Sequence, residues 1–159
     1  MYKKHLLTTV ILGIASLFIA AGIYAACPEI IKMENAKYEK HKKGVVDFDH
    51  KKHGEVYAKE FADLYKQGCG ECHHDENNKP LTDITCDTKV QSCIECHKKP
   101  GERPKGKDAP KLSKKEKLEY HAEAIHENCK GCHKKFNKKY KPKKAPTTCA
   151  KCHPKTKKS

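Results

Sequence analysis

The stretch Cys69-Gly-Glu-Cys72-His73-His74 contains the motif on which the fold depends, and the chain repeats its first five positions three more times. The other copies are Cys93-Ile-Glu-Cys96-His97, Cys129-Lys-Gly-Cys132-His133 and Cys149-Ala-Lys-Cys152-His153. Cys-x-x-Cys-His is the attachment sequence of c-type haem, in which two thiols form thioethers to the macrocycle and the histidine ligates the iron. The sequence therefore predicts four covalently bound haem groups, with His73, His97, His133 and His153 as their proximal ligands.

Other uses of paired cysteines fit this pattern less well. A zinc ribbon does not need a histidine after every second cysteine. A thioredoxin-like redox motif would occur once, beside a βαβ pattern that this sequence lacks. A disulfide scaffold would not require four identical spacings. Haem attachment is the interpretation that explains all four copies.

The composition predicts that side chains alone do not fill the interior. The chain has 159 residues, enough for one domain, but only 36 % are hydrophobic and Trp is absent, against 10 Cys and 11 His. A large enzyme with its own substrate domain is excluded, and so is ordinary disorder. We expect a small, mainly α-helical and irregular multihaem fold, with short helices and long loops wrapped around four haems.

The N-terminus has the character of an export segment. Lys3 and Lys4 precede an uncharged apolar stretch over residues 6–26, which is also long enough to span a bilayer. Three interpretations remain open: a cleaved signal peptide, a lipoprotein signal lipidated at Cys27, or a retained membrane anchor. Each places the rest of the chain outside the cytoplasmic membrane, so we expect a periplasmic protein. The expected organisation is an N-terminal segment over 1–25, an extension over 26–44 and a haem domain over 45–159.

Histidine is abundant enough to supply the second axial ligands. Outside the motifs and the export segment, six histidines remain, and methionine occurs only as Met1 and Met33. The six are His41, His50, His53, His74, His121 and His126. Two imidazoles on each iron predict low, negative reduction potentials. Iron closed on both faces favours electron transfer over catalysis, so we do not expect an enzyme.

The order of the histidines and motifs is informative: Val45-Val46-Asp47-Phe48-Asp49-His50-Lys51-Lys52-His53 is followed by Cys69-Gly-Glu-Cys72-His73-His74 and then by three further motifs. This arrangement resembles the class III cytochromes c of the tetrahaem cytochrome c3 type. The resemblance covers about residues 45–153. It implies that His50 is the distal ligand of the haem on Cys69 and Cys72. It likewise implies His74 for the haem on Cys93 and Cys96, and His53 for the haem on Cys129 and Cys132. Phe48 resembles an aromatic residue that packs between haems.

Two histidines compete as distal ligand of the haem on Cys149 and Cys152. Ser113 and Glu116 form a capping-box pattern that predicts a helix over 113–126. His121 and His126 lie about 140° apart around such a helix, so both cannot face one iron. We favour His126, which is closer to Cys129 and continues the row of Leu118 and Ala122.

Other local patterns complete the expected architecture. Val56, Phe61, Leu64 and Tyr65 share one side of a helical pattern that ends at Gly68. A loop is expected over 98–111 and a turn over 75–80, because Pro, Gly and polar residues cluster there. Strand signals are weak throughout. Cys27 and Cys86 lie outside the motifs, and either a disulfide between them or a free Cys86 is compatible with the sequence.

The charge distribution predicts a docking surface. The net charge is +14, and residues 129–159 contain 12 Lys and no acid. Positive charge around an exposed haem edge would attract an acidic redox partner, most plausibly beside the haem on Cys149 and Cys152. Export excludes nucleic acid as a physiological partner.

The leading functional interpretation is a periplasmic tetrahaem electron carrier. In the proteins that the chain resembles, hydrogenases or formate dehydrogenases are the donors and membrane cytochrome complexes are acceptors. One alternative is a membrane-anchored tetrahaem quinol dehydrogenase subunit that feeds a periplasmic reductase. Another is a multihaem reductase, which would need one haem with an open face.

Overall fold

The structure is a computed structural model that describes residues 28–85 and 88–155. The predicted export segment over 1–25 lies outside these residues, as do Cys27 and Cys86. In the described part of the chain, no helix has the length and apolar character needed to cross a membrane.

A short antiparallel pair of strands positions the first histidines. Strand β1 (Ile30–Lys32) pairs with β2 (Asp47–Asp49), and Ile31 lies opposite Phe48. The pairing continues beyond β2, because the backbone N–H of His50 donates to the Glu29 carbonyl at 2.9 Å. Although strand signals in the sequence are weak, this pairing joins the segment 26–44 to the residues that carry His50 and His53.

The segment after His53 is helical but irregular. A π-helical turn η1 (Lys52–Tyr57) leads into α2 (Ala58–Glu60) and a 3₁₀ turn η2 (Ala62–Leu64). Phe61 leaves the helical conformation, with φ −126° and ψ 47°, and is 7 % exposed. Val56 was predicted on the packed side, but this is wrong, because its side chain is 51 % exposed. Gly68 was predicted to end this helix, but the helical segment already ends at Leu64, and Gly68, with a φ of +54°, begins the next 3₁₀ turn.

Phe61 interrupts the predicted helix because it packs against the far end of another element. Its ring centre lies 4.9 Å from those of Phe136 and Tyr140. Beside this contact, the Asp63 carboxylate accepts hydrogen bonds from Lys139 and the Tyr140 hydroxyl. Glu60 pairs with Lys143 at 2.6 Å. The aromatic and ionic contacts fasten the 52–64 segment to the C-terminal half of the chain.

The predicted helix over 113–126 is instead two helices. The capping box of Ser113 and Glu116 is present and opens α4 (Lys114–Leu118). The chain then becomes extended at Tyr120, which pairs with Lys99, before α5 (His121–Lys139) begins. Since the N–H groups of His121 and Ala122 donate to the carbonyls of Lys99 and Gly101, the second half of the predicted helix starts afresh on the loop after the second motif.

Helix α5 continues for 19 residues through the third Cys-x-x-Cys-His motif. It is longer than the short helices that we expected. The other motifs lie in single turns: the 3₁₀ turn η3 (Gly68–Glu71), α3 (Cys93–Cys96) and α6 (Cys149–Cys152). The predicted turn over 75–80 is present, since the Asp75 carboxylate accepts from the N–H groups of Asn77 and Lys79.

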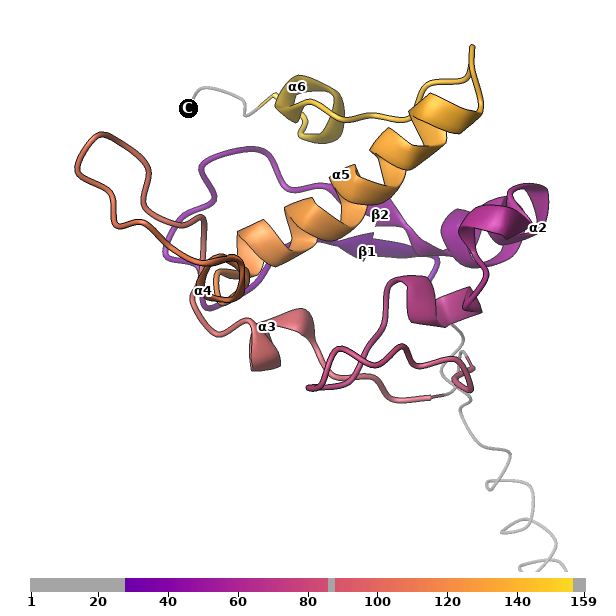
Figure 1. Cartoon of the computed structure of the whole chain (residues 1–159), viewed down its shortest axis with the longest axis horizontal. Coiled ribbons are helices and arrows are strands. Elements are labelled where there is room, and N and C mark those ends of the chain that lie inside the picture. Colours follow the sequence, from indigo (N-terminus) through magenta and orange to yellow (C-terminus); the bar gives the residue numbers. More distant parts are fainter. Residues whose placement is uncertain (1–27, 86–87, 156–159) are drawn as a thin grey trace, which may run out of the picture.

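Figure 1 shows α5 running through the middle of the molecule, with α6 on one side, α3 on the other and α2 towards its C-terminal end. The hydrophobic core is very small. Within the described residues, Phe61 and Ile94 are the only buried hydrophobic side chains. Burial of hydrophobic side chains therefore contributes little to holding these elements together.

Candidate functional site

Each Cys-x-x-Cys-His motif forms one helical turn that brings its cysteines and histidine together. In three motifs the histidine N–H donates to the carbonyl of the first cysteine, at 2.9 Å for His73 and His97 and 2.8 Å for His153. In the third motif, the same spacing lies inside α5. All eight motif cysteines are free thiols. Each motif thus presents two unpaired thiols beside one imidazole.

Every motif histidine faces a second histidine from elsewhere in the chain. The ring centres of His73 and His50 are 6.3 Å apart, and those of His97 and His74 are 6.0 Å apart. Two imidazoles on opposite sides of one metal ion would have ring centres about 6 Å apart, given metal–nitrogen bonds of about 2 Å. Both pairs fit that arrangement.

The other two pairs involve residues on α5. His133 lies in the third motif, and its ring centre is 6.3 Å from that of His53. His126, one helical turn before Cys129, has its ring centre 6.2 Å from that of His153 in α6. These four pairs bring together the histidines that the resemblance implied, and His126 rather than His121 lies opposite His153. That they ligate iron stays a prediction.

Backbone carbonyls orient many of these imidazoles. In the motifs, Nδ1 of His97 lies 2.5 Å from the Leu118 carbonyl oxygen, Nδ1 of His133 lies 2.6 Å from that of Pro146, and Nδ1 of His153 lies 2.8 Å from that of Gly44. A carbonyl oxygen can only accept, so each Nδ1 carries the proton and each Nε2 keeps a lone pair. This is the usual arrangement of a metal-ligating histidine.

The histidines opposite them follow the same rule in two cases. Nδ1 of His53 donates to the Asp49 carbonyl, and Nδ1 of His74 donates to the Asp75 carbonyl, both at 2.8 Å. His50 differs, because its Nδ1 is buried with no hydrogen-bond partner among the described residues. Five of the eight paired rings are therefore fixed in the tautomer that leaves Nε2 free to bind a metal.

The sequence model of the class III cytochrome C family matches residues 27–153. The chain belongs to this family. A class III cytochrome c carries covalently bound haem c and acts as an electron carrier, and members of the family are typically periplasmic. Among curated proteins and solved structures, none is significantly similar to the chain.

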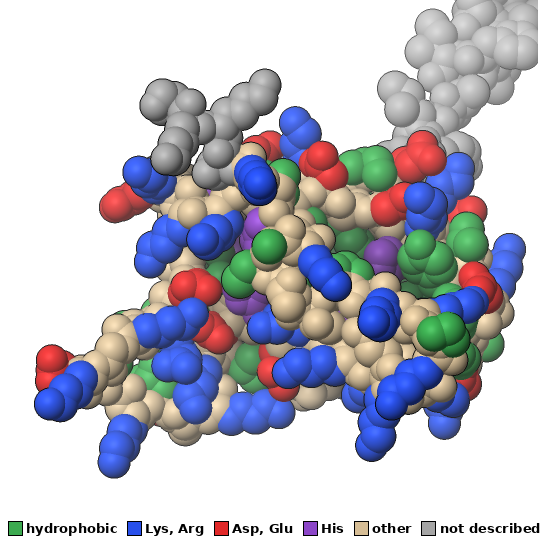
Figure 2. All heavy atoms as spheres, turned by 90° about the horizontal axis from the view of Figure 1, so that it is seen from above, with side chains coloured by type: hydrophobic (Ala, Val, Ile, Leu, Met, Phe, Trp, Pro, Cys, Tyr) green, Lys and Arg blue, Asp and Glu red, His purple; other side chains and the backbone are tan. Residues whose placement is uncertain are grey.

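The donor set of this class III cytochrome c suits haem better than a bare metal ion. Within residues 28–85 and 88–155, no group of three or more His, Cys, Asp or Glu side chains is arranged to hold a metal ion. Each histidine pair supplies two nitrogens, which leaves the remaining positions for the four nitrogens of a planar macrocycle. Figure 2 shows histidine side chains recessed in hollows of the surface. The residues present therefore fit haem c.

Partial burial disfavours the thiolate form of several motif cysteines. It raises the pKa of Cys72 to about 12, with smaller contributions from the neighbouring thiols Cys129 and Cys132. Burial also raises the pKa of Cys93, Cys129 and Cys132.

Two further residues, Phe48 and Gly44, lie in contact with the facing histidines. The ring of Phe48 lies 4.6 Å from that of His53 and 6.0 Å from that of His50, so it stands between two histidine pairs. Gly44 permits the contact that orients His153, because a Cβ at this position would collide with the carbonyl oxygen of Pro154.

The two spare histidines lie together beside a tyrosine that sequence reasoning did not identify. The Tyr38 hydroxyl is 2.8 Å from Nδ1 of His121, and the Tyr38 ring stacks on His41 with centres 5.0 Å apart. Burial lowers the pKa of His121, which is 8 % exposed. Tyr38 lies in the segment taken as an extension, and no motif marks it.

Proposed function

We propose that this class III cytochrome c is a periplasmic electron carrier with four haems of low potential, each ligated by two histidines. The observation that supports it most directly is the fourfold repetition of facing imidazoles 6.0–6.3 Å apart, each pair beside its own two thiols. The proposed ligand pairs are His50 with His73, His74 with His97, His53 with His133, and His126 with His153.

The chain's own residues would make the carrier and exclude substrate chemistry. When bound, haem supplies one-electron exchange at iron. A facing pair of imidazoles would hold the iron from two sides and would leave no place there for a substrate, so no catalytic residue is assigned. Carbonyl acceptors at Nδ1 make an imidazole more electron-rich, which favours ferric iron and lowers the potential. This is the property needed to carry electrons from a strongly reducing donor.

The partner surface that we propose is the lysine-rich region around α6. Not every lysine of residues 129–155 is available, since Lys139 pairs with Asp63 and Lys143 with Glu60. Other lysines here are exposed and form no ion pair with the described residues: Lys134, Lys135, Lys138, Lys141, Lys144, Lys151 and Lys155. Two lysines of this surface, Lys151 and Lys155, each lie two residues from His153. The surface suits an acidic partner, such as a hydrogenase or formate dehydrogenase as donor or a membrane cytochrome complex as acceptor.

Intact mass and spectroscopy of the purified holoprotein test the haem assignment. We expect a mass increase of four haems, a wholly low-spin ferric EPR spectrum and negative midpoint potentials in a titration followed by visible absorption. Fewer haems, or a high-spin component in the native protein, would contradict the proposal. An open haem would instead favour a reductase.

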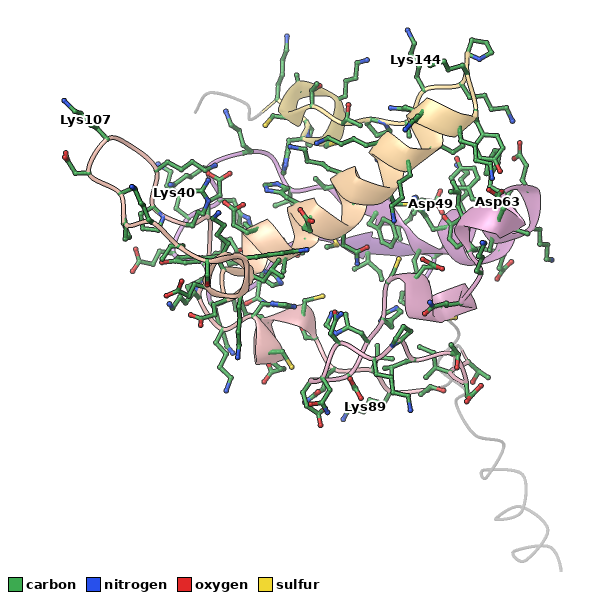
Figure 3. The ribbon with its side chains drawn as sticks, viewed as in Figure 1. Lys40, Asp49, Asp63, Lys89, Lys107 and Lys144 are labelled. Atoms are coloured by element: carbon green, nitrogen blue, oxygen red, sulfur yellow. The ribbon has the colours of Figure 1, made fainter. Side chains whose placement is uncertain are left out.

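A pair of charge reversals tests the docking surface. Lys151 lies in α6, whereas Lys89 lies on the opposite side of the molecule (Figure 3). We expect K151E to slow reduction by a periplasmic hydrogenase about fivefold at low ionic strength, and to weaken the salt dependence of the rate. K89E changes the net charge equally and should leave the rate nearly unchanged. Equal effects of the two variants would show that only net charge matters.

A further inference from the structure

The loop between α3 and α4 is held at both ends and carries a second concentration of positive charge. At its start, Lys99 and Gly101 accept backbone hydrogen bonds from His121 and Ala122 at the beginning of α5. At its end, the Ser113 capping box fixes α4. Between these points the loop projects from the body of the molecule, with Lys107 at its tip (Figure 3). The two ends of the loop are thus fixed by neighbouring elements.

The inner side of this loop lines an open cavity of about 400 Å³. Every charged residue that lines it is a cation: Arg103, Lys105, Lys111 and Lys117. The other lining residues are small or apolar, and none is acidic. A concave surface with four cations and no carboxylate would concentrate anions from solution.

The cations are only partly neutralised by neighbouring carboxylates. Lys105 pairs with Glu102 at 3.0 Å, and Arg103 lies 3.8 Å from the Glu123 carboxylate. Lys111 and Lys117 form no ion pair within the described residues. Two cations of the cavity therefore lack a partner, and Arg103 has only a distant one.

We propose that this cavity binds a small polyvalent oxyanion of the phosphate or sulfate type. A tetrahedral oxyanion can accept hydrogen bonds from several cationic side chains at once, including the planar guanidinium of Arg103. A single carboxylate offers fewer acceptors and less charge. The cavity is also large enough to admit such an ion together with water.

Arg103 connects this site to one histidine pair. Its partner Glu123 lies one helical turn before His126 on α5, so the two side chains share a face. One oxygen of Glu123 is buried and accepts no hydrogen bond. An oxyanion that draws Arg103 towards the cavity would leave the Glu123 charge less compensated. The added anion and the less compensated charge of Glu123 would both favour ferric iron at the haem of His126 and His153. This coupling rests on the proposed ligation.

Calorimetric titration of the oxidised holoprotein with inorganic phosphate at constant ionic strength tests the site. We expect saturable binding, and about tenfold weaker binding by the K111Q/K117Q double variant. The control is K114Q/K115Q, which removes the same charge from the loop–α4 region without altering the cavity lining, and should change the affinity less than twofold. Absence of binding, or equal losses in the two double variants, would overturn the proposal.

Three further measurements identify the source of the ligand and test its coupling to the haem. Sulfate should compete with phosphate, whereas chloride at the same ionic strength should not. If phosphatidylglycerol vesicles bind through Lys111 and Lys117 while inorganic phosphate does not, the site serves a membrane surface and the free-oxyanion proposal is wrong. Phosphate should lower the midpoint of the haem on Cys149 and Cys152, and E123Q should reduce that shift whereas E127Q should not. Since binding is measured without electron transfer, its failure is distinct from failure of the carrier function.

Discussion

Substitution of His126 by alanine provides the sharpest test of the histidine pairs. In the wild type, four iron sites each have two imidazoles under the proposed ligation. H126A removes one of these eight ligands, so one quarter of the iron should become high-spin and three quarters should stay low-spin. The affected haem is the one on Cys149 and Cys152, whose remaining ligand is His153.

His121 is not expected to replace the lost ligand. It lies about 140° around the α5 axis from His126, and its Nδ1 is hydrogen-bonded to Tyr38 at 2.8 Å. Rotation of α5 to bring His121 to His153 would displace His133 in the same helix, and with it the pair that His133 forms with His53. The loss should therefore be local and uncompensated.

EPR spectra of the oxidised variants provide the measurement, with visible spectra for the haem count. The matched control is H121A, which removes a histidine from the same helix and should keep all four haems low-spin. H121A should lower the free energy of unfolding by about 1 kcal/mol through loss of the hydrogen bond to Tyr38. A high-spin component in H121A, together with an unchanged spectrum of H126A, would refute the assignment.

Three further perturbations follow from the packing around the site. F61A should lower the free energy of unfolding by about 3–5 kcal/mol, because Phe61 is 7 % exposed and joins the 52–64 segment to α5. Denaturant unfolding followed by far-UV circular dichroism measures this loss, and a value below about 1 kcal/mol would contradict the packing argument. The pKa of Asp63 is held below its ordinary value of 3.8 by hydrogen bonds from Lys139 and Tyr140, so its stabilisation is present above that pH and is lost as the pH falls through the folded-state pKa. D63N should therefore unfold at lower denaturant at pH 7 and show a flatter decline below about pH 4, whereas a decline as steep as in the wild type would assign the acid sensitivity to other groups. G44A should shift the potential of the haem on Cys149 and Cys152 selectively, because the added Cβ displaces the carbonyl that orients His153; equal shifts at all four haems would point to a general loss of structure.

The sequence was most informative where chemistry requires a particular side chain. Thioether formation needs thiols at one spacing and ligation needs imidazoles, so the motif predicted the thiols with their neighbouring histidines and the histidine count predicted a sufficient supply of second ligands. The assignment of His50, His74 and His53 to particular motifs followed instead from the resemblance to the family. The family is established independently by the match over residues 27–153. Haem number, ligation and partners stay predictions that the experiments above address.

The sequence was less informative where the backbone makes the contact. The carbonyls of Gly44, Leu118 and Pro146 orient three motif histidines, and a carbonyl has the same chemistry in every residue. The break at Tyr120 has a similar origin. Local propensity favours a continuous helix after Ser113, but the pairing of Tyr120 with Lys99 overrides it and leaves the Leu118 carbonyl free for His97. Such tertiary contacts leave no local pattern to detect.

The orienting contacts also explain how a chain with so small a hydrophobic core can hold its segments together. The bond from His153 to Gly44 spans 109 residues, that from His97 to Leu118 spans 21, and that from His133 to Pro146 spans 13. Each contact therefore links a proposed haem ligand to another part of the chain. Closing such loops costs entropy, and within the described residues only two buried hydrophobic side chains help to offset that cost. A haem that held the histidines in place would strengthen these links. Under the proposed ligation, haem attachment and folding of this chain would be one coupled process, in which the ligands that set the potential would also connect the segments of the fold.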